Sequence, residues 1–314
     1  MAAPSSVPLP GTTPPAITPS SSRGTVIVAR PVRHPWRTFG AIVVVALIAS
    51  LLYTFASSPN MDWATVGEYL FADLTFRGLG VTLLLTAVSM VIGIVGGTLV
   101  AVMRLSENYV LRSVAVGYIW FFRGTPVLVQ IIFWGFLGAF FPLIQFGIPF
   151  TDITFFSRPT GALISSTTAA ILALGLNEIA YAAEIVRSGI QSIGQGQREA
   201  AAALGLSPAR TMRTVILPQA MRVIIPPLGN EVITMLKTTA LVSVIAGQDL
   251  LTNLQQVYAQ NFQVIPLLVV ASLWYLALVS VLSVAQSLLE KRFGRGFTAH
   301  RATRATLSDA GRTR

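Results

Sequence analysis

The chain has 314 residues, of which 53% are hydrophobic and 11% charged, and its mean hydropathy is +0.69. A typical soluble domain carries about a quarter charged residues, so this composition excludes an ordinary soluble protein. Cysteine is absent, and the two histidines, His34 and His300, lie in polar tails. These counts exclude disulfides, cysteine nucleophiles, histidine metal clusters and a histidine-containing triad. We therefore expect an all-α integral membrane protein.

The two ends of the chain are polar and basic. Residues 1–37 are rich in Pro, Ser and Thr, and all their charged residues are arginines. We expect a disordered N-terminal tail rather than a signal peptide, because a long polar stretch precedes the first apolar run. Residues 291–314 form a similar C-terminal tail, with seven basic residues against one acid.

Six segments between the tails are apolar over about 20 residues, which is the length of a transmembrane helix. Five are charge-free, and the sixth contains only Glu231 and Lys237. In chain order the segments are residues 38–61, 78–103, 124–151, 160–177, 223–247 and 264–289. The sequence thus predicts about six transmembrane helices.

The distribution of basic residues predicts the orientation of these helices. With the N-terminus in the cytoplasm, 18 of the 22 basic residues lie on the cytoplasmic side, whereas the outer loops hold only Arg77 and Arg158. This matches the positive-inside rule, so we expect both termini in the cytoplasm. The net charge of +10 then reflects topology and anionic lipid headgroups rather than binding to nucleic acid.

The largest internal polar segment, residues 187–218, has the pattern of a helix, a turn and a second helix. Residues 198–204 are rich in alanine and favour a helix, which Gly205 can end in the left-handed conformation. Ser207 then offers an N-cap, and Pro208 suits the first helical position. We expect the second short helix to end near the following Leu-Pro pair, on the cytoplasmic side.

This segment resembles the EAA loop of bacterial ABC importer permeases. The matching residues, at the family's spacing, are Glu199, Ala200, Ala201, Gly205, Leu217 and Pro218. The resemblance implies that the loop forms coupling helices that dock on an ATP-binding subunit. An amphipathic cytoplasmic hairpin without a partner is the alternative.

Three further strings are similar to the polar amino acid branch of these permeases, which includes histidine, glutamine, arginine and glutamate importers. They are Phe-Arg-Gly-Thr-Pro at 122–126, the Asn-Glu and Tyr-Ala-Ala-Glu strings within 177–190, and Pro-Leu-Gly-Asn-Glu at 227–231. The resemblance implies a five-span type I importer core over residues 75–290, with an extra N-terminal span at 38–56. Thr238-Thr239-Ala240 departs from the acid and serine that relatives often carry there.

Ionisable residues within the apolar segments are expensive and usually face the interior of a helical bundle. The candidates for a substrate pathway or gate are Arg123, Glu178, Asn230, Glu231, Thr234 and Lys237. They either meet a zwitterionic ligand or form a structural network between helices, and the residues alone leave both open. Glu231 and Lys237 are six residues apart, so we expect no direct pair between them.

Other features have a structural interpretation. Glu184 and Arg187 are spaced for an ion pair near the cytoplasmic end of the fourth segment. Gly93 and Gly97 permit close helix contact, which is more often ordinary packing than a dimer seam. Pro226 and Pro227 predict a kink in the fifth segment.

The chain lacks a Walker A motif, because neither lysine follows a glycine. We expect a non-enzymatic permease that binds no cofactor or metal, and ATP with Mg²⁺ on a separate subunit. The resemblance implies two ATP-binding subunits, a second permease chain (identical or paralogous) and an extracytoplasmic solute-binding protein, at the plasma membrane. An ion-coupled secondary transporter is the alternative function, but many such folds show internal repeats and none is evident here. A membrane-embedded enzyme would lack reactive side chains in the spans.

Overall fold

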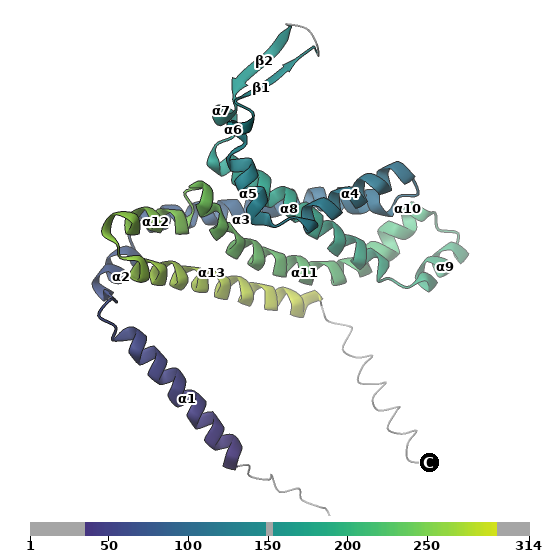
Figure 1. Ribbon diagram of the computed structural model, residues 1–314. Coiled ribbons are helices and arrows are strands. Elements are labelled where there is room, and N and C mark those ends of the chain that lie inside the picture. The colour runs from purple at the N-terminus through teal and green to yellow at the C-terminus, as the bar shows by residue number, and fades with distance from the viewer. Residues whose placement is uncertain (1–34, 149–152, 294–314) are drawn as a thin grey trace, which may run out of the picture. The chain divides into compact units, whose positions relative to one another are not determined.

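The computed structural model describes residues 35–148 and 153–293, and it divides the chain into two units at Ser57 and Ser58. The first unit contains α1 (Pro35–Ala56), whose apolar stretch Phe39–Ala56 is long enough to cross a membrane (Figure 1). The helix takes in residues 35–37 of the predicted N-terminal tail. The rest of that tail, and the C-terminal tail from residue 294, lie outside the described residues.

The second unit is built on four long helices that run alongside one another (Figure 1). They are α3 (Asp73–Leu105), α8 (Ser166–Gln191), α11 (Leu217–Thr238) and α13 (Val264–Phe293). A fifth candidate span is bent by 95° between α4 (Tyr109–Gly124) and α5 (Val127–Gly135). With α1, the described residues hold five helices able to span a membrane, or six with the bent pair. The expected all-α membrane fold is confirmed.

Shorter elements connect these helices. The helical ones are α2 (Trp63–Leu70), α6 (Leu137–Phe140), α7 (Thr160–Leu163), α9 (Gln195–Ala203), α10 (Pro208–Thr211), the π turn η1 (Met212–Ile216), the 3₁₀ turn η2 (Thr239–Ile245) and α12 (Leu250–Asn261). Two strands, β1 (Leu143–Gly147) and β2 (Thr154–Pro159), pair as an antiparallel hairpin. Asp62 begins α2 as its N-cap, and a hydrogen bond from the Thr65 hydroxyl lowers the pKa of this carboxyl.

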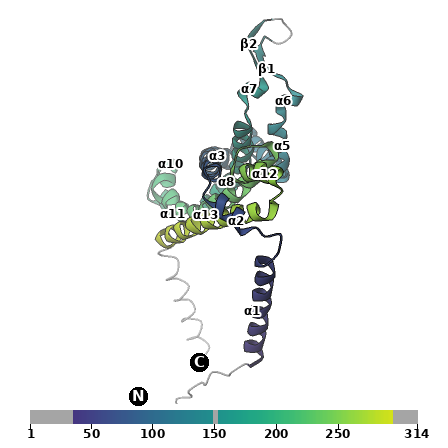
Figure 2. The same cartoon turned by 90° about the vertical axis from the view of Figure 1, so that its left-hand side faces the viewer.

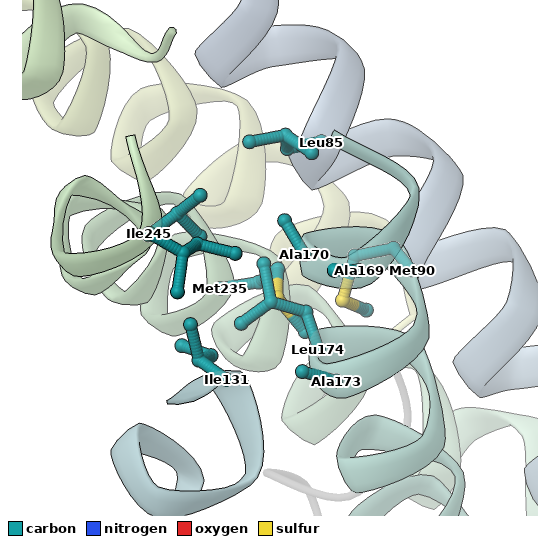
Figure 3. Close-up of a cluster of buried hydrophobic side chains, with 10 residues drawn as sticks. Leu85, Met90, Ile131, Ala169, Ala170, Ala173, Leu174, Met235 and Ile245 are labelled. Atoms are coloured by element: carbon teal, nitrogen blue, oxygen red, sulfur yellow. The ribbon is translucent and has the colours of Figure 1, made fainter. Parts of the chain in front are cut away.

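The buried apolar residues form three clusters along the bundle. In the cluster shown in Figure 3, Leu85 of α3, Leu174 of α8 and Ile245 of η2 pack together with Ile131 of α5. A second cluster joins α2, α3, α12 and α13, and a third joins α3, α4, α8 and α11 near the cytoplasmic loop. The first cluster anchors α5 to the bundle, which positions the bend described below.

The most extensive helix contact is the seam between α3 and α8. A Cβ atom at Gly93 would overlap the Glu178 side chain, and one at Gly97 would lie 2.6 Å from the Ala182 Cβ. Small residues at this spacing let two backbones approach closely. The Gly93 and Gly97 pair therefore serves packing within the chain, as expected.

The prediction of a single span over residues 124–151 is wrong. The preceding helix, α4, ends at Gly124, and Pro126 lacks the N–H that would continue its hydrogen-bond ladder. The chain turns by 95° into α5, passes through α6 and enters the hairpin, so this apolar run contains two short helices and β1. An apolar run alone does not distinguish these elements from one long helix.

Two other boundaries differ from the predictions. The fourth span, α8, begins at Ser166 rather than residue 160 and continues to Gln191, because its charged residues are buried or paired instead of ending it. The second cytoplasmic helix does not end near Leu217. Pro218 cannot donate to the carbonyl four residues back, and a π turn widens the helix there, with the Leu217 N–H bonding to the Met212 oxygen. The helix then continues into α11.

Candidate functional site

A polar cavity of about 420 Å³ lies where the α4–α5 bend faces α8 and α11. Arg123, Glu178, Glu231 and Thr234, four of the six predicted pathway residues, line it. The other lining residues are Gly124, Thr125, Pro126, Val127, Leu174, Asn177, Tyr181, Met235 and Thr238. Asn230 and Lys237 are exposed and are not among the lining residues.

A hydrogen-bond network holds the bend that shapes this cavity. The Gln130 amide nitrogen donates to the Phe122 carbonyl (3.1 Å), the Thr125 carbonyl (3.2 Å) and the Thr125 hydroxyl (2.8 Å). Asn177 of α8 donates to the same Phe122 carbonyl (2.9 Å) and to the Gln130 side-chain oxygen (3.4 Å). Carbonyls freed at a helix end need partners where water is scarce, and these two amides supply them.

Arg123, the last cation of α4, points toward α8. Its guanidinium carbon lies 5.1 Å from the centre of the Tyr181 ring, within the range of a cation–π interaction. The Tyr181 ring also lines the cavity, so the contact holds a positive charge at the cavity wall. Asn177 and Tyr181 belong to strings that the sequence resemblance used, but their place in the site required the fold.

Glu178 is the most buried acid of the cavity. Its side chain is 4% exposed, and its Oε1 atom has no hydrogen-bond partner among the described residues. The side chain fits against α3 because Gly93 offers no Cβ there. A buried carboxylate oxygen without a partner is costly, and a ligand cation or a water in the cavity would satisfy it.

The predicted pathway residues of α11 divide between the cavity and other surroundings. Thr234 and Thr238 line the cavity, and the Thr238 hydroxyl donates to the Thr234 carbonyl (2.9 Å). Glu231 is half-buried, whereas Lys237 is exposed. No ion pair joins these two residues in the part of the chain that the structure describes, as their spacing predicts.

The predicted coupling loop, residues 187–218, has the turn that the sequence predicts. Gly205 adopts a left-handed conformation with φ of +73°, and two reverse bonds close α9, from the Gly205 N–H to the Ala202 carbonyl and from the Leu206 N–H to the Ala201 carbonyl. This is the Schellman motif. Pro208 occupies the first turn of α10, but the Ser207 side chain makes no capping bond there.

Most residues of the predicted coupling loop are available to a partner. Glu199, Ala200, Leu217 and Pro218 are exposed, whereas Ala201 is buried and packs the loop on itself. Glu199 also lines a shallow hollow of about 490 Å³ beside Arg198. Leu204, which sequence reasoning did not single out, is 80% exposed at the turn.

Polar contacts hold the loop end of α8 to its neighbours. Glu184 accepts from Arg187 at 2.6 Å, which confirms the predicted pair, and it also lies 3.6 Å from Arg104 of α3. Arg198 of α9 reaches the Ile190 carbonyl at 3.5 Å. Through this bond α9 is anchored to α8, which also carries the cavity residues Leu174, Asn177, Glu178 and Tyr181.

Comparison with known proteins shows the family to which the chain belongs. Residues 93–295 match the family described as the binding-protein-dependent transport system inner membrane component. The chain belongs to this family. The permease is 43% identical to the arginine transport system permease protein ArgU of Corynebacterium glutamicum over 294 residues, covering 93% of this chain and 91% of ArgU.

Further relatives and solved structures are also amino acid transport proteins. The permease is 34% identical to the glutamine transport system permease protein GlnP of Escherichia coli K12, covering 74% of this chain and 98% of GlnP. The crystal structure of an amino acid ABC transporter with histidines matches with a TM-score of 0.58 and 36% identity, over 70% of this chain and 94% of that one. The methionine transporter MetNI, at 20% identity and a TM-score of 0.53, shares the fold.

These matches establish an ABC importer permease of the type I fold, as the sequence resemblance implied. In such importers ATP hydrolysis lies on a partner subunit, and the family implies an ATP-binding subunit and a partner permease. The relatives give no support to the ion-coupled alternative.

Proposed function

We propose that this permease carries a cationic amino acid through the cavity at the α4–α5 bend. The observation that supports this most is the charge pattern of the lining: two carboxylates, from Glu178 and Glu231, and one guanidinium, from Arg123. An amino acid with a basic side chain carries two positive groups and one carboxylate, which is the complementary set. The arginine system of the relative ArgU is consistent with this substrate class.

The coupling loop transmits work from ATP hydrolysis on the partner subunit. Glu199 and Ala200 at the exposed side of α9, with Leu204 at the turn, offer the docking surface. Two ATP-binding subunits, a second permease chain and a solute-binding protein on the outer face complete the importer. The basic residues around the loop and in the tails support a topology with both termini and this loop in the cytoplasm.

Uptake into proteoliposomes tests this proposal. The complex is reconstituted with its ATP-binding subunit and binding protein, and labelled arginine is offered with glutamine as competitor. We expect accumulation that requires hydrolysable ATP inside and persists when ionophores dissipate ion gradients. Uptake driven by an ion gradient without ATP would contradict the proposal.

A matched pair of variants tests the cavity. Glu231→Gln removes a lining charge, whereas Lys237→Met removes an exposed charge outside the lining. We expect Glu231→Gln to raise the arginine concentration at half-maximal uptake more than Lys237→Met does, with both complexes fully assembled. Equal effects, or none in Glu231→Gln, would mean that the cavity is not the substrate site.

A further inference from the structure

The bend after α4 sends an arm away from the bundle. The arm consists of α5, α6, the β1–β2 hairpin and α7, and α5 lies at 95° to α4. Figure 1 shows the arm rising across the direction of the long helices, between the end with α12 and the end with α9. Figure 2, turned by 90°, shows the same sideways projection.

The root of the arm lies at a depth where the membrane is apolar. Arg77 and Arg104 mark the ends of α3 and are about 40 Å apart along the helix, close to the full thickness of a bilayer. Ile131 of α5 packs in the same cluster as Leu85 (Figure 3). Leu85 lies about 12 Å along α3 from Arg77, inside the boundary of the hydrocarbon.

The hairpin has exposed faces and open edges. Phe146 is 66% exposed and Phe155 75% exposed, and they belong to opposite strands. The sheet contains two strands in the described residues, so the outer edge of each strand lacks a neighbouring strand. An isolated two-stranded hairpin is marginally stable, and open strand edges do not occur against lipid. A hairpin at the depth of the arm's root therefore needs a protein surface to cover its open edges.

The two edges differ in how well they are protected. Natural edge strands avoid pairing with another chain by carrying charges or proline. β2 carries both, in Arg158 and Pro159, whereas β1 reads Leu-Ile-Gln-Phe-Gly and carries neither. The edge of β1 is thus the one suited to accept another strand.

We propose that β1 pairs with β1 of a second copy of this permease, which joins the two hairpins into one four-stranded sheet. An antiparallel pair of identical strands has a two-fold axis through its middle, so the same edge complements itself. This rests on the proposed assembly of two permease chains and names the contact between them. It covers the open edge and places the apolar side chains against protein.

Disulfide trapping tests this contact, because the chain contains no cysteine of its own. Gln145 is the central residue of β1, and its cross-strand neighbour in the hairpin is Ser157 of β2. In an antiparallel β1 pair, residues near the axis lie about 4.5–5.5 Å apart, within reach of a disulfide. The variants are Gln145→Cys on β1 and Ser157→Cys on β2. The second is the matched control, because β2 carries the charge and the proline that disfavour pairing with another strand. Ile144→Cys and Phe146→Cys extend the test to neighbouring registers.

Each variant is oxidised in the complex purified with its ATP-binding subunit, so that only assembled transporter is scored. We expect a permease dimer linked through at least one β1 cysteine and loss of that dimer in Ser157→Cys. Equal linking from both strands, no linking from any β1 position, or linking to a different protein would overturn the proposal. ATP-dependent uptake is measured on the same samples. A linked dimer without such uptake would contradict the proposed function and leave the β1 contact standing.

Discussion

Glu178 of α8 packs against Gly93 of α3, where a Cβ atom on the glycine would overlap the Cγ of the glutamate. This contact links the tightest helix seam of the bundle to the most buried acid of the cavity. Packing and charge placement at this point thus depend on the same missing side chain.

Gly93→Ala should therefore displace Glu178 and impair both assembly and uptake. Overpacking of a close contact costs roughly 1–3 kcal/mol. Gly80→Ala, on the same helix, is the control, because nothing lies within 4 Å of its Cβ position. Thermal unfolding of the purified complex and arginine uptake measure the difference between the two variants. Equal melting temperatures and uptake rates would mean that the close contact between Gly93 and Glu178 is not needed.

Gln130→Leu should destabilise the bend between α4 and α5. The substitution keeps a similar volume but removes the amide that bonds the Phe122 and Thr125 carbonyls. Asn177 still donates to the Phe122 carbonyl, but the Thr125 carbonyl loses its Gln130 donor, and an acceptor left unsatisfied away from water costs roughly 1–3 kcal/mol. We expect lower thermal stability and weaker uptake, while Gln286→Leu on α13, where the half-buried amide donates to the exposed Glu290 side chain, behaves like wild type. Unchanged uptake in Gln130→Leu would show that the bend does not need this amide.

Local rules predicted some elements well. The charge-free runs that became α3 and α13 were evident, because length and apolarity suffice for a straight span. The left-handed turn at Gly205 was also evident, since an alanine-rich helix followed by glycine has few other solutions.

The bend and the arm were not predictable in this way. The network that holds the bend joins Asn177 to Phe122, which are 55 residues apart, so no local pattern contains it. The hairpin lies within a run whose apolar residues suit a strand as well as a helix. The cavity residue Tyr181 belongs to a recognised string, but only packing brings it over Arg123.

Gly205 offers a test of the coupling loop. Its surroundings are open within 4 Å, so a substitution acts through the positive φ rather than through crowding. We expect Gly205→Val to weaken co-purification of the ATP-binding subunit and substrate-stimulated ATP hydrolysis. Gly205→Asn should retain more of both, because asparagine tolerates this conformation. Gly194→Val is the control, since Gly194 is also in open space and has no positive φ. Full activity in Gly205→Val would argue against this loop as the coupling element.

Asp249 offers a test by pH. It is the fully buried N-cap of α12, and burial raises the pKa of its carboxyl above 3.8. The pKa of this carboxyl is therefore higher in the folded than in the unfolded protein. Its contribution to the free energy of unfolding is complete below the unfolded pKa and is lost as the pH rises through the folded pKa. Asp249→Asn removes the charge and keeps one of the two capping oxygens, so its melting temperature relative to wild type should be higher at pH 8 than at pH 4.

Asp249→Ala separates the cap from the charge. It loses the acceptor for the Leu251 and Thr252 N–H groups and should cost about 1 kcal/mol. A loss of melting temperature in Asp249→Asn that is greater at pH 8 than at pH 4 would mean that the carboxylate charge itself stabilises this end of the bundle.

The π turn before Pro218 has a mechanical consequence. Because the chain widens there instead of breaking, residues 208–245 form one unbroken span of 38 residues. Leu217 and Glu231 are then separated by about 21 Å of helix, at 1.5 Å for each residue. Pro226 and Pro227 lie between these two residues and give no backbone N–H to the helix ladder, so a tilt at the loop end reaches Glu231 through a point where the helix can bend. One helix thus joins the surface offered to the ATP-binding subunit to the charge lining of the cavity, with a hinge between them.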